Sequence, residues 1–127
     1  MRALLDTHAL IWWILDKPEL PRRVRHRIGQ CDQVFVSAVS AMEVCTKHRI
    51  GKLPEAALLA KEFGPRVAIA GLIELPLSAR HAQLAGNLNI AAKDPFDRML
   101  IAQSLLEGLP LVSNEASFDH FGVSRLW

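Results

Sequence analysis

The fold of this chain is decided by residues 3–15, which read Ala3-Leu4-Leu5-Asp6-Thr7-His8-Ala9-Leu10-Ile11-Trp12-Trp13-Ile14-Leu15. The three apolar residues at the start are typical of a short buried strand that ends at Asp6. From Thr7 onward the apolar side chains recur at helical spacing, which predicts a helix that runs to Leu15. A buried strand followed at once by a helix is the first step of an alternation that favours a parallel sheet covered on both faces.

The same alternation continues outward along the chain. Further strands are expected at residues 34–36, 72–75, 111–112 and 124–126. Further helices are expected at about 21–28, from Ser37 or Ser40 to about Gly51, and at 54–63, 78–88 and 94–107. No internal repeat, low-complexity run or linker interrupts this pattern. We therefore expect one α/β domain that spans residues 1–127.

The composition is that of an ordinary globular protein. The chain has 127 residues, of which 50% are hydrophobic and 22% charged, enough for one domain with a core. No segment approaches the roughly 20 apolar residues that cross a bilayer, and Asp6 interrupts the first apolar stretch too early for a signal peptide. We therefore expect no membrane association and a cytoplasmic protein. Cys31 and Cys45 lack metal-ligand spacing and are expected to be reduced and partly buried thiols.

The basic residues are concentrated in the first part of the chain. Residues 1–52 hold nine Lys/Arg against five Asp/Glu, a balance of +4, whereas residues 53–127 hold six against eight, a balance of −2. Much of the excess lies on one expected helix, in Arg22, Arg23, Arg25 and Arg27. Such a cluster can bind a phosphate backbone. A solvated helix face explains the same charges, and charge alone favours that explanation.

Five acidic residues stand where strands end or helices begin. Asp6 follows the first strand, Glu115 follows the strand at 111–112, and Glu43 lies about two turns into a helix. Asp94 and Asp97 open the late helix, three residues apart and therefore on one face. Ligands of an open parallel sheet bind outside the carboxyl ends of its strands, so these acids are expected to converge on one rim.

Carboxylates that crowd together repel one another and remain ionised only when a cation neutralises them. Oxygen ligands without nearby His or Cys select Mg²⁺ or Mn²⁺ over zinc. Two such ions about 4 Å apart can activate water and stabilise the leaving oxygen in phosphodiester hydrolysis. The residues therefore permit a metal-dependent nuclease.

Each acid also has a structural explanation. Asp6 can cap the helix that begins at Thr7, and Asp94 before Pro95 is well suited to cap the late helix. Asp97 stands where a capping box places its acid. Glu43 can pair with a lysine four residues on, at Lys47, on a solvent face. Glu115 can be an ordinary loop acid, so the residues alone leave both interpretations open.

Four segments resemble the motifs of PIN-domain toxins of the VapC type. They occur in the family's order over essentially the whole chain, and they read Leu4-Leu5-Asp6-Thr7-His8-Ala9-Leu10-Ile11-Trp12-Trp13, Ser37-Ala38-Val39-Ser40-Ala41-Met42-Glu43-Val44, Asp94-Pro95-Phe96-Asp97-Arg98-Met99-Leu100-Ile101-Ala102-Gln103 and Leu111-Val112-Ser113-Asn114-Glu115-Ala116-Ser117-Phe118. The resemblance implies a PIN-like three-layer α/β/α domain with a central parallel sheet. It carries the family's metal-binding acids onto Asp6, Glu43 and Asp97, with Asp94 as an added acid at the edge of the pocket. The fourth motif departs from the usual Thr-x-Asp, because Glu115 takes the place of the Asp.

The resemblance implies a Mg²⁺- or Mn²⁺-dependent endoribonuclease that hydrolyses RNA with water activated by the metal. Asp6, Glu43, Asp97 and Glu115 are the expected catalytic residues, and with Asp94 they are the expected metal ligands. Thr7 and Ser113 are expected to position the acids or the phosphate, and Arg22, Arg23 and Arg27 to bind RNA. An antitoxin and a second copy of the chain are the expected protein partners, with Trp12, Trp13 and the helix at 54–63 as contact surfaces. Two alternatives stay open: a PIN-like binding module without nuclease activity, and a phosphotransfer enzyme with Asp6 as nucleophile.

Overall fold

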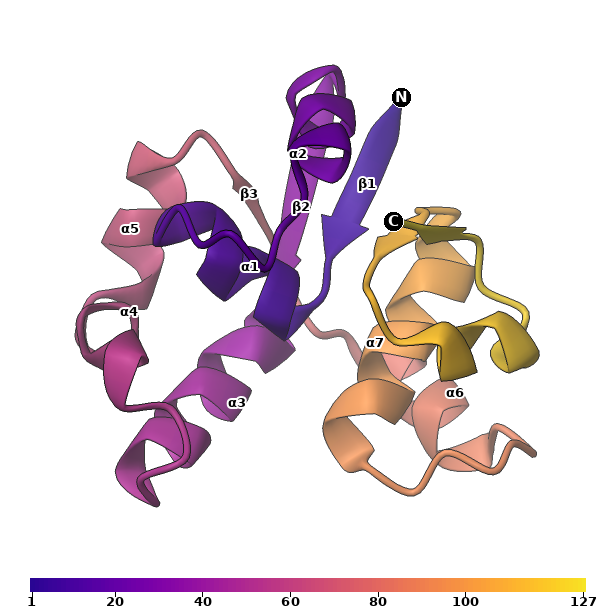
Figure 1. Ribbon diagram of the computed structural model, residues 1–127. Coiled ribbons are helices and arrows are strands. Elements are labelled where there is room, and N and C mark those ends of the chain that lie inside the picture. The colour runs from indigo at the N-terminus through magenta and orange to yellow at the C-terminus, as the bar shows by residue number, and fades with distance from the viewer.

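The computed structural model describes all residues, Met1–Trp127, and is built around a five-stranded parallel sheet (Figure 1). The strands follow the order β3-β2-β1-β4-β5. Their bounds are Arg2–Leu5 for β1, Gln33–Ser37 for β2, Ile73–Leu75 for β3, Leu111–Val112 for β4 and Arg125–Leu126 for β5. The expected α/β/α class is confirmed.

The helices connect the strands so that the chain reverses direction across the sheet at β1. From β1 it moves outward to β2 and β3, and it then returns through two helices to β4, on the other side of β1. The carboxyl ends of the paired strands β1 and β4 are therefore the switch point of the sheet, where ligands of open α/β folds bind. The helices are α1 (Thr7–Ile14), α2 (Arg22–Gly29), α3 (Ala38–Arg49), η1 (Pro54–Ala56), α4 (Ala57–Lys61), α5 (Phe63–Ile69), α6 (Ala79–Asn87), α7 (Pro95–Glu107) and η2 (Ala116–Phe121).

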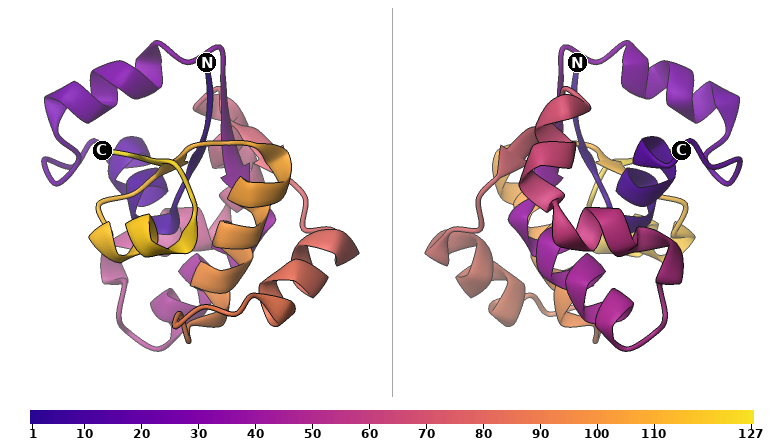
Figure 2. Two further views of the ribbon diagram at one scale, coloured as in Figure 1. Left: turned by 90° about the vertical axis from the view of Figure 1, so that its right-hand side faces the viewer. Right: turned by 90° about the vertical axis from the view of Figure 1, so that its left-hand side faces the viewer.

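Both faces of the sheet are covered. Ala3 and Leu5 pack into a core shared with α1 to α5, whereas Leu4, between them, packs against α7 on the other face. This follows from the alternation of side chains along a strand. Figure 2 shows α1 and α2 on one side of the sheet and α6 and α7 on the other. None of the helices combines the length and the apolar character needed to cross a membrane.

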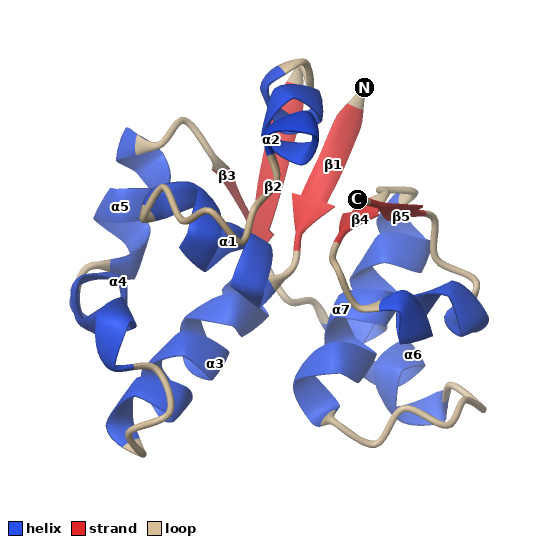
Figure 3. Cartoon of the chain, viewed as in Figure 1, coloured by secondary structure: helices blue, strands red, loops and turns tan.

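The helices begin at the expected caps. Ser37, rather than Ser40, caps α3 by accepting from the backbone N–H of Val39 at 3.0 Å. Ser78 caps α6 in the same way, and Asp94 caps α7 ahead of Pro95. The caps satisfy N–H groups that have no partner within the first turn. Strands in red and helices in blue alternate along the chain in Figure 3.

Two parts of the structure differ from the expected elements. The helix expected at 54–63 is broken into η1 and α4, and a further helix, α5, continues to Ile69. Pro65 lies in the first turn of α5, where the missing N–H removes no helical hydrogen bond. The helix η2 was not expected either, because its six residues carry no clear periodicity. Cys31 and Cys45 are both free, and Cys31 is half-buried as expected. The expectation of partial burial is wrong for Cys45, which is exposed on α3.

Candidate active site

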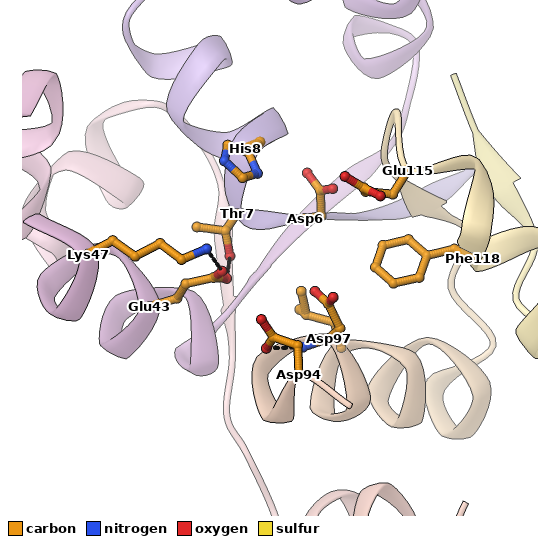
Figure 4. Close-up of a pocket in the computed structure, with 10 residues that line it drawn as sticks. Asp6, Thr7, His8, Glu43, Lys47, Asp94, Asp97, Glu115 and Phe118 are labelled. Carbon is orange, nitrogen blue, oxygen red and sulfur yellow. Dashed lines mark hydrogen bonds and ion pairs between the residues drawn. The ribbon is translucent and has the colours of Figure 1, made fainter. Parts of the chain in front are cut away.

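A pocket of about 220 Å³ opens at the carboxyl ends of β1 and β4. All five acids singled out in the sequence line it, although they come from four separate segments of the chain (Figure 4). The lining residues are Asp6, Thr7, His8, Glu43, Lys47, Asp94, Asp97, Leu100, Glu115 and Phe118. The convergence expected from the strand ends is therefore present in the structure.

Asp6 lies at the back of the pocket, directly after β1. It is 5% exposed, and its Oδ1 accepts from the backbone N–H of Ala9 at 2.8 Å, so it also caps α1. Burial raises the pKa of the Asp6 carboxyl, and the charge of Glu43 adds to the rise. Hydrogen bonds from Ser113 and Ala9 lower the pKa but do not cancel the effect of burial. The structure thus holds a carboxylate where its charge is costly.

Glu43 is held from two sides in the first part of α3. It is 4% exposed, and its Oε2 lies 2.6 Å from Nζ of Lys47, one helical turn further on. The Thr7 hydroxyl donates to Oε1 of Glu43 and also lies 2.9 Å from Oγ of Ser40. The expected pairing of Glu43 with Lys47 is confirmed, but it lines the pocket and not a solvent face.

Asp94 and Asp97 enter the pocket from the start of α7. Oδ1 of Asp94 accepts from the backbone N–H groups of Phe96 and Asp97, at 2.8 and 3.3 Å. Burial raises the pKa of Asp97 to about 7, with further contributions from the charges of Asp94, Glu43 and Glu115. Asp94 is thus both the cap and a pocket acid, whereas the pKa of Asp97 is raised by burial and by three neighbouring carboxylates.

Glu115 reaches the pocket from the loop after β4. Its backbone N–H donates to Oγ of Ser113 at 3.0 Å, and Ser113 is fully buried. The Ser113 hydroxyl also lowers the pKa of Asp6, so this side chain links the β4 loop to the end of β1. Thr7 and Ser113 therefore both contact pocket acids, as expected for positioning residues.

The donor set fits a hard divalent cation. It consists mainly of carboxylate oxygens, with one imidazole from His8 and no thiol, and such an oxygen-rich set is the ligand chemistry of Mg²⁺ and Mn²⁺. As the side chains stand, no three His, Cys, Asp or Glu side chains gather closely enough to hold a metal ion. The reason is visible in the contacts, since Glu43 faces Lys47 and Thr7 while Asp6 faces the N-terminus of α1. Ligation thus requires side-chain rotation.

The structure does not bring Arg22, Arg23 and Arg27 to the pocket. These side chains are exposed on α2, which lies beside the amino end of β1, at the far end of the sheet from the acids (Figure 1). The expected role in RNA binding therefore has no support from proximity to the site. RNA binding by these arginines was inferred from their charge alone, and charge carries no information on where a helix lies relative to the site.

Three pocket residues were missed as functional candidates. The sequence suggests Lys47 only as a partner of Glu43 and assigns no role to His8, but both line the pocket. Phe118 comes from the unexpected η2 and closes the pocket beside Glu115. The spacing of four residues from Glu43 was the signal for Lys47, and the position two residues after Asp6 was the signal for His8.

The family model described as PIN domain matches residues 3–123 of the chain. Among curated proteins, no sequence matches at a significant level. Several solved structures are similar in fold, including the following three. VapBC2 from Rickettsia felis, bound to a DNA fragment from its promoter, has a TM-score of 0.73 at 15% identity and covers 99% of this chain and 98% of its own.

DNA-bound VapBC from Salmonella typhimurium has a TM-score of 0.71 at 20% identity, over 99% of this chain and 97% of its own. A toxin–antitoxin complex from Klebsiella pneumoniae has a TM-score of 0.61 at 20% identity, over 98% and 96%. At these identities the likeness concerns the fold.

Proposed function

The chain belongs to the PIN-domain family, and from that premise we propose that it is a divalent-metal-dependent endoribonuclease and the toxin of a toxin–antitoxin pair. The observation that carries the proposal is the convergence of Asp6, Glu43, Asp94, Asp97 and Glu115 on one pocket at the switch point of the sheet. Helix capping accounts for the positions of Asp6 and Asp94, but it does not require that four distant segments bring acids to a single cavity. Mutual repulsion is a cost that a bound cation removes.

In the proposed site, Asp6, Glu43 and Asp97 hold one Mg²⁺ or Mn²⁺, while Asp94 and Glu115 stand beside it. When bound, the cation supplies an activated water and neutralises charge that develops on the phosphate. Glu115 replaces the shorter Asp of the family's fourth motif, and its longer side chain still lines the pocket. The proposal leaves open a second ion near Glu115 and Asp94.

The remaining polar residues orient the acids. Thr7, which also contacts Ser40, fixes one oxygen of Glu43. Ser113 contacts Asp6 and the backbone of Glu115, so it holds the loop after β4 next to the end of β1. Such hydrogen bonds hold ligands in place before substrate arrives. Arg22, Arg23 and Arg27 belong to the proposal only for RNA nucleotides that lie away from the pocket.

The proposed protein partners are an antitoxin and a second copy of the chain. The structures that are similar in fold include VapBC proteins and a toxin–antitoxin complex, which supports an antitoxin for this chain. Trp12 and Trp13 are half-buried against the core, and their remaining surface is available for contact. A cytoplasmic location and a single domain over residues 1–127 also remain predictions.

The test is cleavage of end-labelled RNA by the purified protein with Mg²⁺ or Mn²⁺. We expect discrete products that disappear with EDTA and in Asp97→Asn. This variant is the sharpest, because Asp97 caps no helix and accepts no hydrogen bond that the substitution would break. A Glu55→Gln variant, which changes an exposed acid far from the pocket, serves as the matched control and should cleave like the wild type.

The outcomes separate the proposal from its alternatives. Cleavage that persists in Asp97→Asn would contradict the assignment of the carboxylate site. A protein that neither cleaves RNA nor binds Mn²⁺ would favour the inactive binding module. A phosphorylated Asp6, trapped after incubation with a phosphoryl donor, would instead favour the phosphotransfer alternative.

A further inference from the structure

Lys47 is the single Lys or Arg among the residues that line the pocket. Its ammonium contacts Glu43, and the charges of Asp94 and Asp97 also act on it. Figure 4 shows the side chain extending from α3 toward Glu43 and Thr7. The pocket therefore contains a cation of its own, which is the chemistry that crowded carboxylates require.

Both oxygens of Glu43 are engaged. Oε2 lies 2.6 Å from Nζ of Lys47, and Oε1 accepts from the Thr7 hydroxyl. Each oxygen of Glu43 therefore already has a hydrogen-bond partner, and the side chain is 4% exposed. Where a metal ion approaches Glu43, a partner that the ion repels has to leave.

The partner that must leave is Lys47. The Thr7 hydroxyl is neutral and can remain beside a ligating carboxylate, as hydroxyl partners of metal ligands do. An ammonium held about 4 Å from a divalent cation is repelled by it, most strongly where water is scarce. The Lys47 side chain is 27% exposed and has a flexible stem, so it can swing toward solvent.

We propose that Lys47 is a positioning residue that serves as an internal counter-cation, holding Glu43 in the metal-free protein and releasing it when a divalent metal binds. This inference rests on the proposed function, since it requires Glu43 to be a metal ligand. Lys47 and the metal then compete for the same carboxylate oxygen. Removing the positive charge at position 47 should therefore tighten metal binding.

The experiment measures Mn²⁺ affinity by isothermal titration calorimetry, without RNA. Two variants, Lys47→Met and Lys47→Gln, remove the charge, and we expect both to bind Mn²⁺ roughly tenfold more tightly, in line with loss of one charged hydrogen bond. Lys47→Arg keeps the charge and should bind close to the wild-type affinity. Lys61→Met, at an exposed lysine of α4, should leave the affinity unchanged.

Thermal melting of each variant reports whether it is folded. If Lys47→Met is unfolded, Lys47→Gln decides, because its amide can still donate to Glu43. Neutral variants that bind Mn²⁺ no more tightly than the wild type would overturn the inference and leave the proposed function intact. Failure of the wild-type protein to bind Mn²⁺ would overturn the metal site and this inference together.

Discussion

At the scale of a single residue, Asp6 has both a structural role and a proposed catalytic role. It caps α1 through Ala9 and lines the pocket, and burial raises its pKa. Asp94 combines the same two roles at the start of α7. The structural and the catalytic explanations of these acids are therefore not alternatives.

This double role predicts a difference between two substitutions of Asp6. Asp6→Asn keeps an oxygen that can accept from Ala9, whereas Asp6→Ala loses it. We expect Asp6→Ala to be less stable than Asp6→Asn by about 1 kcal/mol, the usual contribution of an N-cap. Urea unfolding measures the difference, and RNA cleavage should be lost in both variants.

Two results would contradict this prediction for Asp6. Equal stability of the two variants would mean that the hydrogen bond to Ala9 contributes nothing. Residual cleavage in either variant would remove Asp6 from the proposed metal ligands.

At the scale of elements, Arg98 holds the loop between α6 and α7. It lies in α7, one residue after Asp97, but it does not line the pocket. Its guanidinium donates to the backbone carbonyls of Ala85, at 2.8 Å, Ala92, at 2.7 Å, and Leu88. These carbonyls lie at the end of α6 and in the loop that leads to Asp94. Arg98 therefore sets the position from which Asp94 and Asp97 enter the pocket.

We expect Arg98→Met to destabilise the protein by about 3 kcal/mol, since it removes three charged hydrogen bonds and leaves carbonyls without partners. Arg98→Lys should recover little, because one ammonium cannot reproduce the planar fork. Arg80→Met, at an exposed arginine of α6, is the matched control and should change the unfolding free energy by less than about 0.5 kcal/mol. Denaturant titration distinguishes these values. An Arg98→Met variant whose free energy of unfolding is nearly unchanged would contradict this role of Arg98.

A second link between elements depends on pH. Arg125 of β5 donates to both carboxylate oxygens of Asp119 in η2, at 2.8 and 3.0 Å. The hydrogen bond from Arg125 lowers the pKa of Asp119 below its ordinary value of 3.8. A depressed carboxyl pKa stabilises the fold above pH 3.8 and loses this contribution as the pH falls through the folded value.

We therefore expect wild type to melt slightly above Asp119→Asn near neutral pH, with the gap closing in acid. The effect is small because the Asp119 carboxylate is exposed to solvent, which screens the pair. Melting curves from neutral pH to below 3.8 test it. A gap that stays constant with pH would show that the pair does not respond to protonation of Asp119.

At the scale of the whole molecule, β1 is the strand on which both layers depend. It lies at the centre of the sheet, and its side chains are shared between the two cores. Leu5 faces the larger core and Leu4 the smaller one, and both are fully buried. The same strand also delivers Asp6 to the switch point.

We expect Leu4→Ala and Leu5→Ala each to destabilise the protein by about 3 kcal/mol, through lost burial and the cavity left behind. Ile69→Ala is the control, because Ile69 of α5 is 76% exposed and should contribute less than about 0.5 kcal/mol. Chemical unfolding of the three variants provides the measurement. A small loss at Leu4 alone would mean that the layer formed by α6 and α7 contributes little to the stability of the sheet.

Helices and strands whose own residues show strong apolar periodicity and clear capping residues could be predicted from the sequence. The β1–α1 unit and α7 follow from apolar periodicity, and Asp94-Pro95 and Gly108 mark the ends of α7. The short pieces between Pro54 and Ile69 were not resolved, because weakly periodic segments take their conformation from the core they cover. The helix η2 was missed for the same reason.

The sequence by itself determined the parallel α/β class, the principal caps and the five acids at strand and helix ends, because these depend on periodicity and on residue chemistry next to it. Only the tertiary structure decided which residues meet. Local sequence carries no information on contacts between distant segments, so it could not place α2 away from the pocket or Lys47 inside it. Nor could it show that Arg98 binds three carbonyls of α6 and the loop that follows it, or that Ser113 links Asp6 to Glu115. Those contacts exist because the order of the strands brings β1 and β4 together.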